Sequence, residues 1–385
     1  MAEDWEAGGF GLYIHWPFCE AKCPYCDFNS HVARTIDQRR WRDAYLLELR
    51  RSAAESPGRV LRSVFFGGGT PSLMSPDTAA DVIGEIRRLW PAANDLEITL
   101  EANPGSVEAG KFAAFRQAGV NRISMGVQAL NDQDLKRLGR LHTTAEAMVA
   151  FDIARAAFDR VSFDLIYARQ DQTLEAWTAE LRRALDLAVD HLSLYQLTIE
   201  QGTAFGDRYN AGKLRGLPDE DLGADLYTVT QEICEAAGMP AYEVSNHARS
   251  GAESHHNMVY WRYGDYVGIG PGAHGRMTLA GTRYATEAYS DPTRWLKGVA
   301  NGASEKPRDV LSCTEQATEF LLMGLRVKEG VDLQRYANLA GAPIDDQAVH
   351  ELTELGMITV TRDRLNVTNQ GFSVLDAVIS RLLRD

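Results

Sequence analysis

The chain has 385 residues, 45% of them hydrophobic and 24% charged, which suits a large globular domain with a smaller one attached. Its 40 lysine and arginine residues against 53 aspartate and glutamate residues give a net charge of −13. This charge predicts no nucleic-acid partner and at most peripheral contact with membranes. The sequence has no apolar run of membrane-spanning length, no signal-peptide pattern and no disulfide framework, so we expect a cytoplasmic location.

Apolar runs alternate with amphipathic stretches over the first half of the chain. Six such runs predict strands, at Gly11–Trp16, Val60–Phe66, Leu96–Ala102, Arg122–Val127, Arg160–Ile166 and His191–Ile199. Apolar residues that return every three or four positions predict helices at Arg39–Ala54, Asp77–Trp90, Val107–Ala118, Ala145–Phe158 and Leu174–Leu187. Alternating strands and helices predict an α/β fold with a parallel sheet. Six units with right-handed crossovers favour a partial (β/α)6 TIM-like barrel.

Three cysteines follow the first predicted strand in a CxxxCxxC pattern, within a loop over residues 17–30. The pattern consists of Cys19, Cys23 and Cys26. All three thiolates can reach one metal centre from this loop. Because [4Fe–4S] clusters and zinc sites normally take four ligands, three cysteines leave one position open to bind something else. The alternative is a zinc site completed by His15 or His31.

Glycine-rich and polar motifs follow the next predicted strands. The loop GGGTPS, Gly67–Ser72, is neither a Walker loop nor a dinucleotide fingerprint, but its backbone N–H groups could hold a polar ligand. Other polar residues lie at or near strand ends, namely Glu101, Gln128 and Asp164, and Arg140 follows in the stretch Leu-Gly-Arg-Leu-His. Taken singly, each has a structural explanation as a helix cap, a buried strand end or an ion pair. Because ligands of a barrel gather at the carboxyl ends of its strands, their shared position favours one site.

The rest of the chain is expected to differ from the barrel. The glycine-rich stretch Tyr266–Gly275 is interpreted as a tight turn returning the chain to the barrel mouth, with contact to a bound ligand as the alternative. Helices, a two-stranded ribbon and a last helix then predict a smaller winged-helix-like domain. Residues 311–385 hold 7 lysine and arginine residues against 11 aspartate and glutamate residues, which favours a lid or docking role over DNA binding. We therefore divide the chain into residues 1–240, 241–306 and 307–385.

The motifs GGGTPS, EANPG, NRISMGVQ, LGRLH and FDLIY, in this order after CxxxCxxC, resemble one family of radical S-adenosylmethionine (SAM) proteins. The family contains oxygen-independent coproporphyrinogen III dehydrogenase and the HemW-like heme chaperones. The resemblance covers nearly the whole chain and implies a [4Fe–4S] cluster on the three loop cysteines, with SAM bound at the open iron. In radical SAM enzymes, reductive cleavage of SAM gives methionine and a 5′-deoxyadenosyl radical, which abstracts hydrogen.

The resemblance also implies contacts with SAM, residue by residue. The SAM bound to the cluster would contact Tyr13, Gly68 and Glu101. Residues that match the second SAM contacts of the dehydrogenase are Tyr25, Gly69, Thr70, Gln128, Arg140 and Asp164. The match leaves open whether a second SAM binds.

Three features place the chain on the HemW-like side of the family. Phe28 stands where the dehydrogenase has a further cysteine, and 18 residues precede Cys19 in place of a long N-terminal arm. The third feature is the stretch His256–Trp261, which matches the HNxxYW pattern associated with heme binding in HemW-like proteins. The pattern implies that His256 ligates heme, with His255 and His247 as competitors, whereas the structural alternative is a histidine packed beside aromatic residues.

The sequence therefore leaves two alternative functions. The favoured one is a heme chaperone that binds heme and transfers it to an acceptor hemoprotein, keeping the cluster and exchangeable SAM, with a separate reductant for the cluster. The alternative is an oxidoreductase that acts on coproporphyrinogen III. This alternative must bind propionates, and the sequence shows no concentrated basic cluster near its N-terminus.

Overall fold

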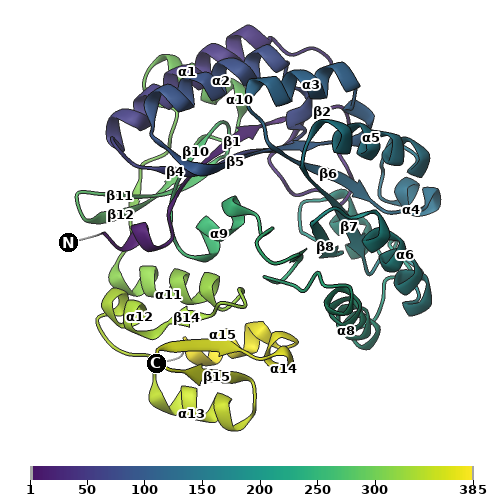
Figure 1. Ribbon diagram of the computed structural model, residues 1–385, viewed down its shortest axis with the longest axis vertical. Helices are drawn as coiled ribbons and strands as arrows, with labels where there is room; N and C mark the ends of the chain where they lie inside the picture. The colour runs from purple at the N-terminus through teal and green to yellow at the C-terminus, as the bar shows by residue number, and fades with distance from the viewer. Residues whose placement is uncertain (1–2, 384–385) are drawn as a thin grey trace.

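A curved, mostly parallel sheet of 11 strands runs through the computed structural model, which describes residues 3–383 (Figure 1). The strands follow the order β13-β12-β11-β10-β1-β4-β5-β6-β7-β8-β9. The parallel strands are β1 (Phe10–Trp16), β4 (Leu61–Gly68), β5 (Ala92–Ala102), β6 (Arg122–Gln128), β7 (Arg160–Tyr167), β8 (His191–Gln196) and β10 (Asp265–Ile269). Antiparallel strands extend both edges, namely β9 (Asn246–Ala248), β11 (His274–Leu279), β12 (Thr282–Glu287) and β13 (Asp309–Val310).

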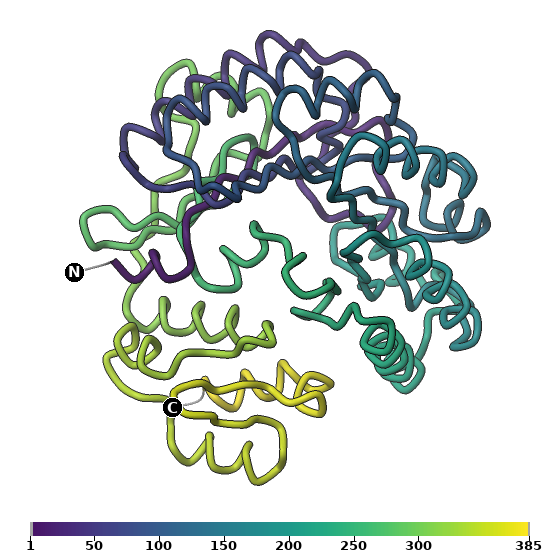
Figure 2. Tube along the Cα trace, in the orientation of Figure 1, coloured from purple at the N-terminus to yellow at the C-terminus, as the bar shows by residue number. Residues whose placement is uncertain are grey.

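Helices cover the convex face of this sheet, as Figure 2 also shows for the chain trace. They are α1 (Gln38–Glu55), α2 (Pro76–Leu89), α3 (Ala109–Ala118), α4 (Asp132–Arg137), α5 (Thr144–Ala157), α6 (Leu174–Leu187), α8 (Glu220–Ala236) and α10 (Pro292–Ala300). The short helix α7 (Ala204–Asn210) packs under the cysteine loop, where Phe205 contacts Tyr25. Helix α9 (His255–Trp261) lies on the concave side and packs against β4 and β1. The concave side is therefore where the HNxxYW stretch meets the barrel.

The six strands and five helices that the sequence predicts are all present, with ends shifted by a few residues. Each buries an apolar face in one core, in which Phe10, Leu12, Ile14 and Trp16 of β1 are fully buried. These alternate residues of β1 share one face, the face that the helices cover, where Trp16 packs on Trp41 and Tyr45 of α1. The prediction of a partial barrel is confirmed, since the strands curve through an open arc instead of closing (Figure 1).

The interpretation of Tyr266–Gly275 as a turn is wrong for its first part. Residues 265–269 form β10, which lies parallel to β1 and pairs Tyr13 with Gly268. Only residues 270–273 turn, and β11 begins at His274. Glycine is needed inside β10 because a Cβ atom at Gly268 would lie 2.0 Å from the His274 carbonyl oxygen. The four glycines of the stretch Tyr266–Gly275 resemble a turn, although the apolar pattern alone would predict a strand there.

The C-terminal domain faces the open side of the arc. It contains α11 (Cys313–Gly324), β14 (Val331–Asp332), α12 (Leu333–Ala340), α13 (Asp346–Glu354), β15 (Ile358–Thr361), β16 (Arg364–Val367), α14 (Asn369–Phe372) and α15 (Leu375–Leu382). Its own core is built around Leu321, Val331 and Leu365. Glu319 joins it to the barrel by accepting hydrogen bonds from Tyr263 and Arg276. The three-part division of the chain stays a prediction, and the ends of its first and last parts lie outside the described residues.

Two small strands, β2 (Phe18–Cys19) and β3 (His31–Val32), close the cysteine loop.

Candidate functional site

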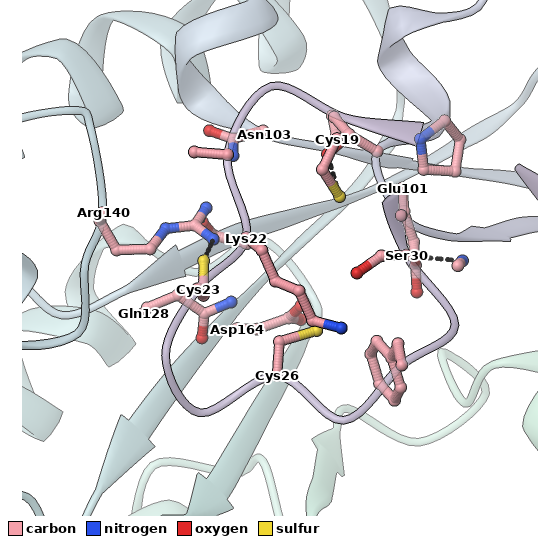
Figure 3. Close-up of a pocket in the computed structure, with 18 of the residues that line it drawn as sticks. Cys19, Lys22, Cys23, Cys26, Ser30, Glu101, Asn103, Gln128, Arg140 and Asp164 are labelled. Carbon is pink, nitrogen blue, oxygen red and sulfur yellow. Dashed lines mark hydrogen bonds between the residues drawn. The ribbon is translucent and has the colours of Figure 1, made fainter. Parts of the chain in front are cut away.

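The three loop cysteines surround a cavity at the carboxyl ends of β1 and β4 to β7, shown in Figure 3 and called here the cysteine cavity. Its volume is about 140 Å³. The lining includes eleven of the residues predicted for this site: Cys19, Cys23, Tyr25, Cys26, Gly68, Gly69, Thr70, Glu101, Gln128, Arg140 and Asp164. Burial raises the pKa of the Cys19 and Cys26 thiols. The structure thus brings together residues from six different segments of the chain.

Two donors point at the sulfur atoms. Thr70 Oγ1 lies 3.5 Å from Cys19 Sγ, and Arg140 Nη1 lies 3.5 Å from Cys23 Sγ. Hydrogen bonds to ligating sulfurs are one of the ways in which proteins tune iron–sulfur clusters. Arg140 is itself held by a 2.7 Å bond from Nη2 to the Gly126 carbonyl oxygen, while its Nε atom is buried without a partner.

The glycine loop allows the chain to pass close beneath the cysteine loop. Gly68 has a φ of +109°, and a Cβ atom there would lie 2.6 Å from His15 Cε1. A Cβ atom at Gly69 would lie 2.6 Å from the Phe18 carbonyl oxygen. Because only glycine fits in this conformation and space, the motif is required by the packing of the two loops. The Gly68 N–H also donates to Glu101 Oε2 at 3.2 Å.

Two carboxyl groups share the floor of the cavity. Burial, and then the nearby Asp164 carboxylate, raise the pKa of Glu101 to about 8. Burial also raises the pKa of Asp164 to about 6, against hydrogen bonds from Ser193 and Ser124 that lower it. Clustered carboxyl groups with raised pKa values are stabilised as carboxylates when a positive charge binds beside them. The site therefore suits a cationic ligand.

Gln128 adopts an unusual backbone conformation at the end of β6. Its φ is +76°, in a region that residues with a side chain rarely occupy, and the pairing of β6 with β7 shifts between Gly126 and Gln128. Its Oε1 atom is buried and has no hydrogen-bond partner. Strained residues and unpaired buried acceptors both occur preferentially at ligand sites.

A second cavity, called here the adjoining cavity, lies between the barrel and the C-terminal domain. Its volume is about 750 Å³, within the range of roughly 300–1,000 Å³ usual for small-molecule sites. It shares Phe28, Gly68 and Glu101 with the cysteine cavity, so the two spaces adjoin. Tyr13, which the sequence analysis assigned to SAM, lines the adjoining cavity and not the cysteine cavity.

The HNxxYW stretch divides between the adjoining cavity and the core. Asn257, Tyr260 and Trp261 line the cavity, whereas His256 is 1% exposed and lies beneath them. Its ring stacks on Phe65 with centroids 5.0 Å apart, and both ring nitrogens are hydrogen-bonded, Nδ1 to Ser63 Oγ and Nε2 to the Tyr260 hydroxyl, each at 2.8 Å. Burial, and then Arg122, lower the pKa of His256 to about 3, so the ring is neutral. Heme ligation by His256 stays a prediction, and it would require the ligating ring nitrogen to give up its hydrogen bond.

The other histidines near the adjoining cavity differ in whether they line it. His247 is buried, and neither it nor His255 lines the adjoining cavity. His15 and His274 do line it. His274 lies in the stretch Tyr266–Gly275, for which a turn and contact with a ligand were the alternatives, and it was not predicted by itself as a site residue. Ser30, Asn103 and Ser124 of the cysteine cavity were not predicted either. Asn103 lies within the EANPG motif, which was the available signal for it.

The fold and the cysteine loop define a radical SAM protein. The profile described as "Radical SAM superfamily" matches residues 13–184, and that of the "HemN C-terminal domain" matches residues 311–374. The chain is 39% identical to "Heme chaperone HemW" of Escherichia coli (strain K12), over 97% of this chain and 98% of the relative. It is also 39% identical to "Radical S-adenosyl methionine domain-containing protein 1, mitochondrial" of Bos taurus, over 97% of this chain and 87% of the relative. The chain belongs to the HemW family of radical SAM proteins.

The fold is also that of a solved structure. A structure described as coproporphyrinogen III oxidase (HemN) from Escherichia coli aligns with a TM-score of 0.82, at 21% identity, over 97% of this chain and 90% of that one. This likeness confirms the architecture of a radical SAM barrel followed by a C-terminal domain. No helix within residues 3–383 is long and apolar enough to cross a membrane.

The residues of the cysteine cavity fit the cofactors that the radical SAM family implies. Within residues 3–383, no three or more His, Cys, Asp or Glu side chains gather closely enough to hold a metal ion. The three sulfur atoms instead stand around a space (Figure 3). The histidines of the zinc alternative are both hydrogen-bonded to Asn29, His15 Nε2 at 2.9 Å and His31 Nε2 at 3.2 Å. The thiols, the unpaired Gln128 and Arg140 atoms and the two carboxyl groups suit a cluster with a cationic SAM beside it.

Proposed function

We propose that this protein is a heme chaperone, which binds heme and transfers it to an acceptor hemoprotein. It carries a [4Fe–4S] cluster on Cys19, Cys23 and Cys26 with exchangeable SAM. The observation that carries the proposal is the adjoining cavity, which is large, lined by aromatic side chains and shares Phe28, Gly68 and Glu101 with the cysteine cavity. Relatives named "Heme chaperone HemW", at 33% to 39% identity, support it. A reducing cytoplasm suits the free thiols, and a separate reductant would serve the cluster.

The side chains of the cysteine cavity have distinct parts in this proposal. Thr70 and Arg140 donate hydrogen bonds toward the sulfur ligands, and Glu101 supplies negative charge to the SAM held at the cluster. Tyr25, Gly69, Gln128 and Asp164 complete the walls against which the rest of SAM would lie. A bound, reduced cluster supplies one electron at a time to this space. Tyr13 lies in the adjoining cavity beside Gly68, so it would contact SAM and heme at their boundary.

Aromatic side chains give the adjoining cavity its affinity for a flat macrocycle. Tyr195, Tyr260, Trp261 and Tyr266 line it, and Tyr195 is 42% exposed. The Tyr260 and Tyr266 rings meet edge to face at 4.4 Å, which fixes the wall. Such rings bury large apolar areas at small cost in conformational entropy.

Heme titration tests this function. The anaerobically reconstituted protein is titrated with heme and followed by the Soret band in difference spectra against the heme-free protein. We expect saturation at one heme per chain while the iron and sulfide content stays unchanged. Absence of saturable binding would contradict the proposal.

A second candidate function rests on the contact between the two cavities. A porphyrinogen in the adjoining cavity would lie beside the space where SAM is cleaved, which is the arrangement a coproporphyrinogen III oxidoreductase needs. Turnover of coproporphyrinogen III to protoporphyrinogen IX by the reduced, SAM-supplied protein would establish this function. Unchanged substrate with saturable heme binding would leave the chaperone.

A further inference from the structure

Heme iron needs a ligand that faces the space in which the macrocycle lies, and only two imidazoles line the adjoining cavity within the described residues. His15 is already used, because Nδ1 lies 3.1 Å from the Tyr13 hydroxyl and Nε2 lies 2.9 Å from the Asn29 carbonyl oxygen. His274 is exposed, and its ring makes no hydrogen bond within residues 3–383. It is thus the free imidazole of the cavity.

The backbone holds His274 firmly while leaving its ring free. His274 begins β11, where it pairs with Glu287 of β12, and its carbonyl oxygen packs against Gly268. A ligand on a paired strand is positioned more exactly than one on a loop. By contrast, His256 is 1% exposed, and ligation through Nε2 would displace its hydrogen-bond partner, the Tyr260 hydroxyl.

Charged side chains are unevenly distributed around the adjoining cavity. Glu101 of β5 lies on its barrel side, whereas Arg326, which follows α11 in the C-terminal domain, is the one lysine or arginine among its lining residues. Glu243 also lines the cavity and pairs with Val327, next to Arg326. Arg326 Nη2 donates to Asp376, whose side chain is 93% exposed, at 3.3 Å. Because so exposed an ion pair is weak, the guanidinium can exchange this partner for a ligand carboxylate.

From this geometry we infer that His274 is the iron ligand of heme in the adjoining cavity, and that the propionates face Arg326. The inference rests on the proposed heme binding and specifies its site. Tyr260 and Trp261 of the HNxxYW stretch form the wall, and His256 is a positioning residue that holds Tyr260 by a hydrogen bond. Heme then contacts the barrel and the C-terminal domain together, so movement of the domain would open its site.

Ferric heme titrations of single variants test this site. We expect His274→Ala to weaken heme binding at least about tenfold or to shift the Soret band of ferric heme, and added imidazole to restore the position of that band. His255→Ala is the matched control, since His255 is half-buried in the same region but does not line the cavity. His255→Ala should leave affinity and spectrum unchanged. Arg326→Ala should weaken heme binding and leave the position of the Soret band unchanged.

The results separate failure of the site from failure of the function. A normal heme spectrum and affinity in His274→Ala would overturn the inference, and a shifted Soret band in His256→Ala alone would move the ligand to His256. If the unsubstituted protein binds no heme, the proposed function itself fails. Iron and sulfide content shows for each variant that the fold is intact, as does the thermal unfolding midpoint for the His274, His255 and Arg326 variants. His274→Gln provides a conservative second variant.

Discussion

The Nε2 atom of His256 lies 2.8 Å from the hydroxyl oxygen of Tyr260, so two members of the HNxxYW stretch bond to each other one helical turn apart. Nδ1 of the same ring lies 2.8 Å from Ser63 Oγ on β4. The ring therefore ties α9 to the barrel and fixes the direction of a side chain that lines the adjoining cavity. In the described structure the stretch acts as a support for the cavity wall.

Replacement of His256 should lower stability. His256→Ala leaves the buried Ser63 hydroxyl without a partner and opens a cavity under Tyr260, which should cost about 2–4 kcal/mol of unfolding free energy. Thermal unfolding measures the loss, and His255→Ala is the control on the same helix. An unchanged midpoint in His256→Ala would show that the ring does not support the fold.

The cluster should depend on three cysteines only. Cys19→Ser, Cys23→Ser and Cys26→Ser should each abolish a stable [4Fe–4S] centre, because each removes one of the three protein ligands. Iron and sulfide analysis with electron paramagnetic resonance measures this. Cys313→Ser at an exposed cysteine and Cys234→Ala at a buried one are the controls. Loss of the centre in either control would show that the ligand set is wrong.

SAM should perturb the cluster through the open iron. Adding SAM to the reduced protein should change its electron paramagnetic resonance spectrum, and Glu101→Ala should weaken this effect. Removal of a buried charged partner commonly costs about 2–5 kcal/mol, so the apparent affinity should fall by well over tenfold in a titration. A spectrum that does not change at saturating SAM would contradict SAM binding at the cluster.

The stability of the cluster-free protein should depend on Glu101 and pH. The folded protein holds the Glu101 proton up to about pH 8, whereas the unfolded chain releases it near its ordinary pKa of 4.5. Unfolding free energy should therefore fall as the pH rises from 4.5 to 8. Glu101→Gln removes this decrease in unfolding free energy. The variant should therefore be more stable than the unsubstituted protein at pH 8.5 by on the order of 2 kcal/mol, and equally stable at pH 4.5.

Thermal unfolding of the cluster-free protein at both pH values measures the difference. Glu354→Gln, at an exposed glutamate of α13, is the control and should have no effect at either pH. Equal midpoints for Glu101→Gln and the unsubstituted protein at pH 8.5 would show that Glu101 is ionised without cost.

Most of the barrel and the cysteine cavity could be predicted from the sequence, because hydrophobic periodicity is local and parallel strands bring their carboxyl ends together. Glu101, Gln128 and Asp164 lie on β5, β6 and β7, so each strand end delivers its residue to the same space. The strand β10 was not predicted because Gly268 and the glycines of the turn that follows it resemble one long turn.

The adjoining cavity could not be predicted in this way. Tyr195 of β8, His274 of β11 and Arg326 of the C-terminal domain meet there through contacts between segments far apart in the sequence. A local sequence pattern carries no information about such contacts. The HNxxYW motif indicated the region correctly, but the motif does not show that His256 faces inward while Tyr260 and Trp261 face the cavity.

Direct transfer of heme is the measurement that tests the central claim. The heme-loaded protein is mixed with the apo-form of a b-type hemoprotein from the same organism, in the presence of an excess of an unrelated heme scavenger, and the Soret bands of acceptor and scavenger are followed. A chaperone that hands heme over directly should fill the acceptor ahead of the scavenger, and free heme added in its place should fill the scavenger first. Loss of all heme to the scavenger from the loaded protein would contradict the account.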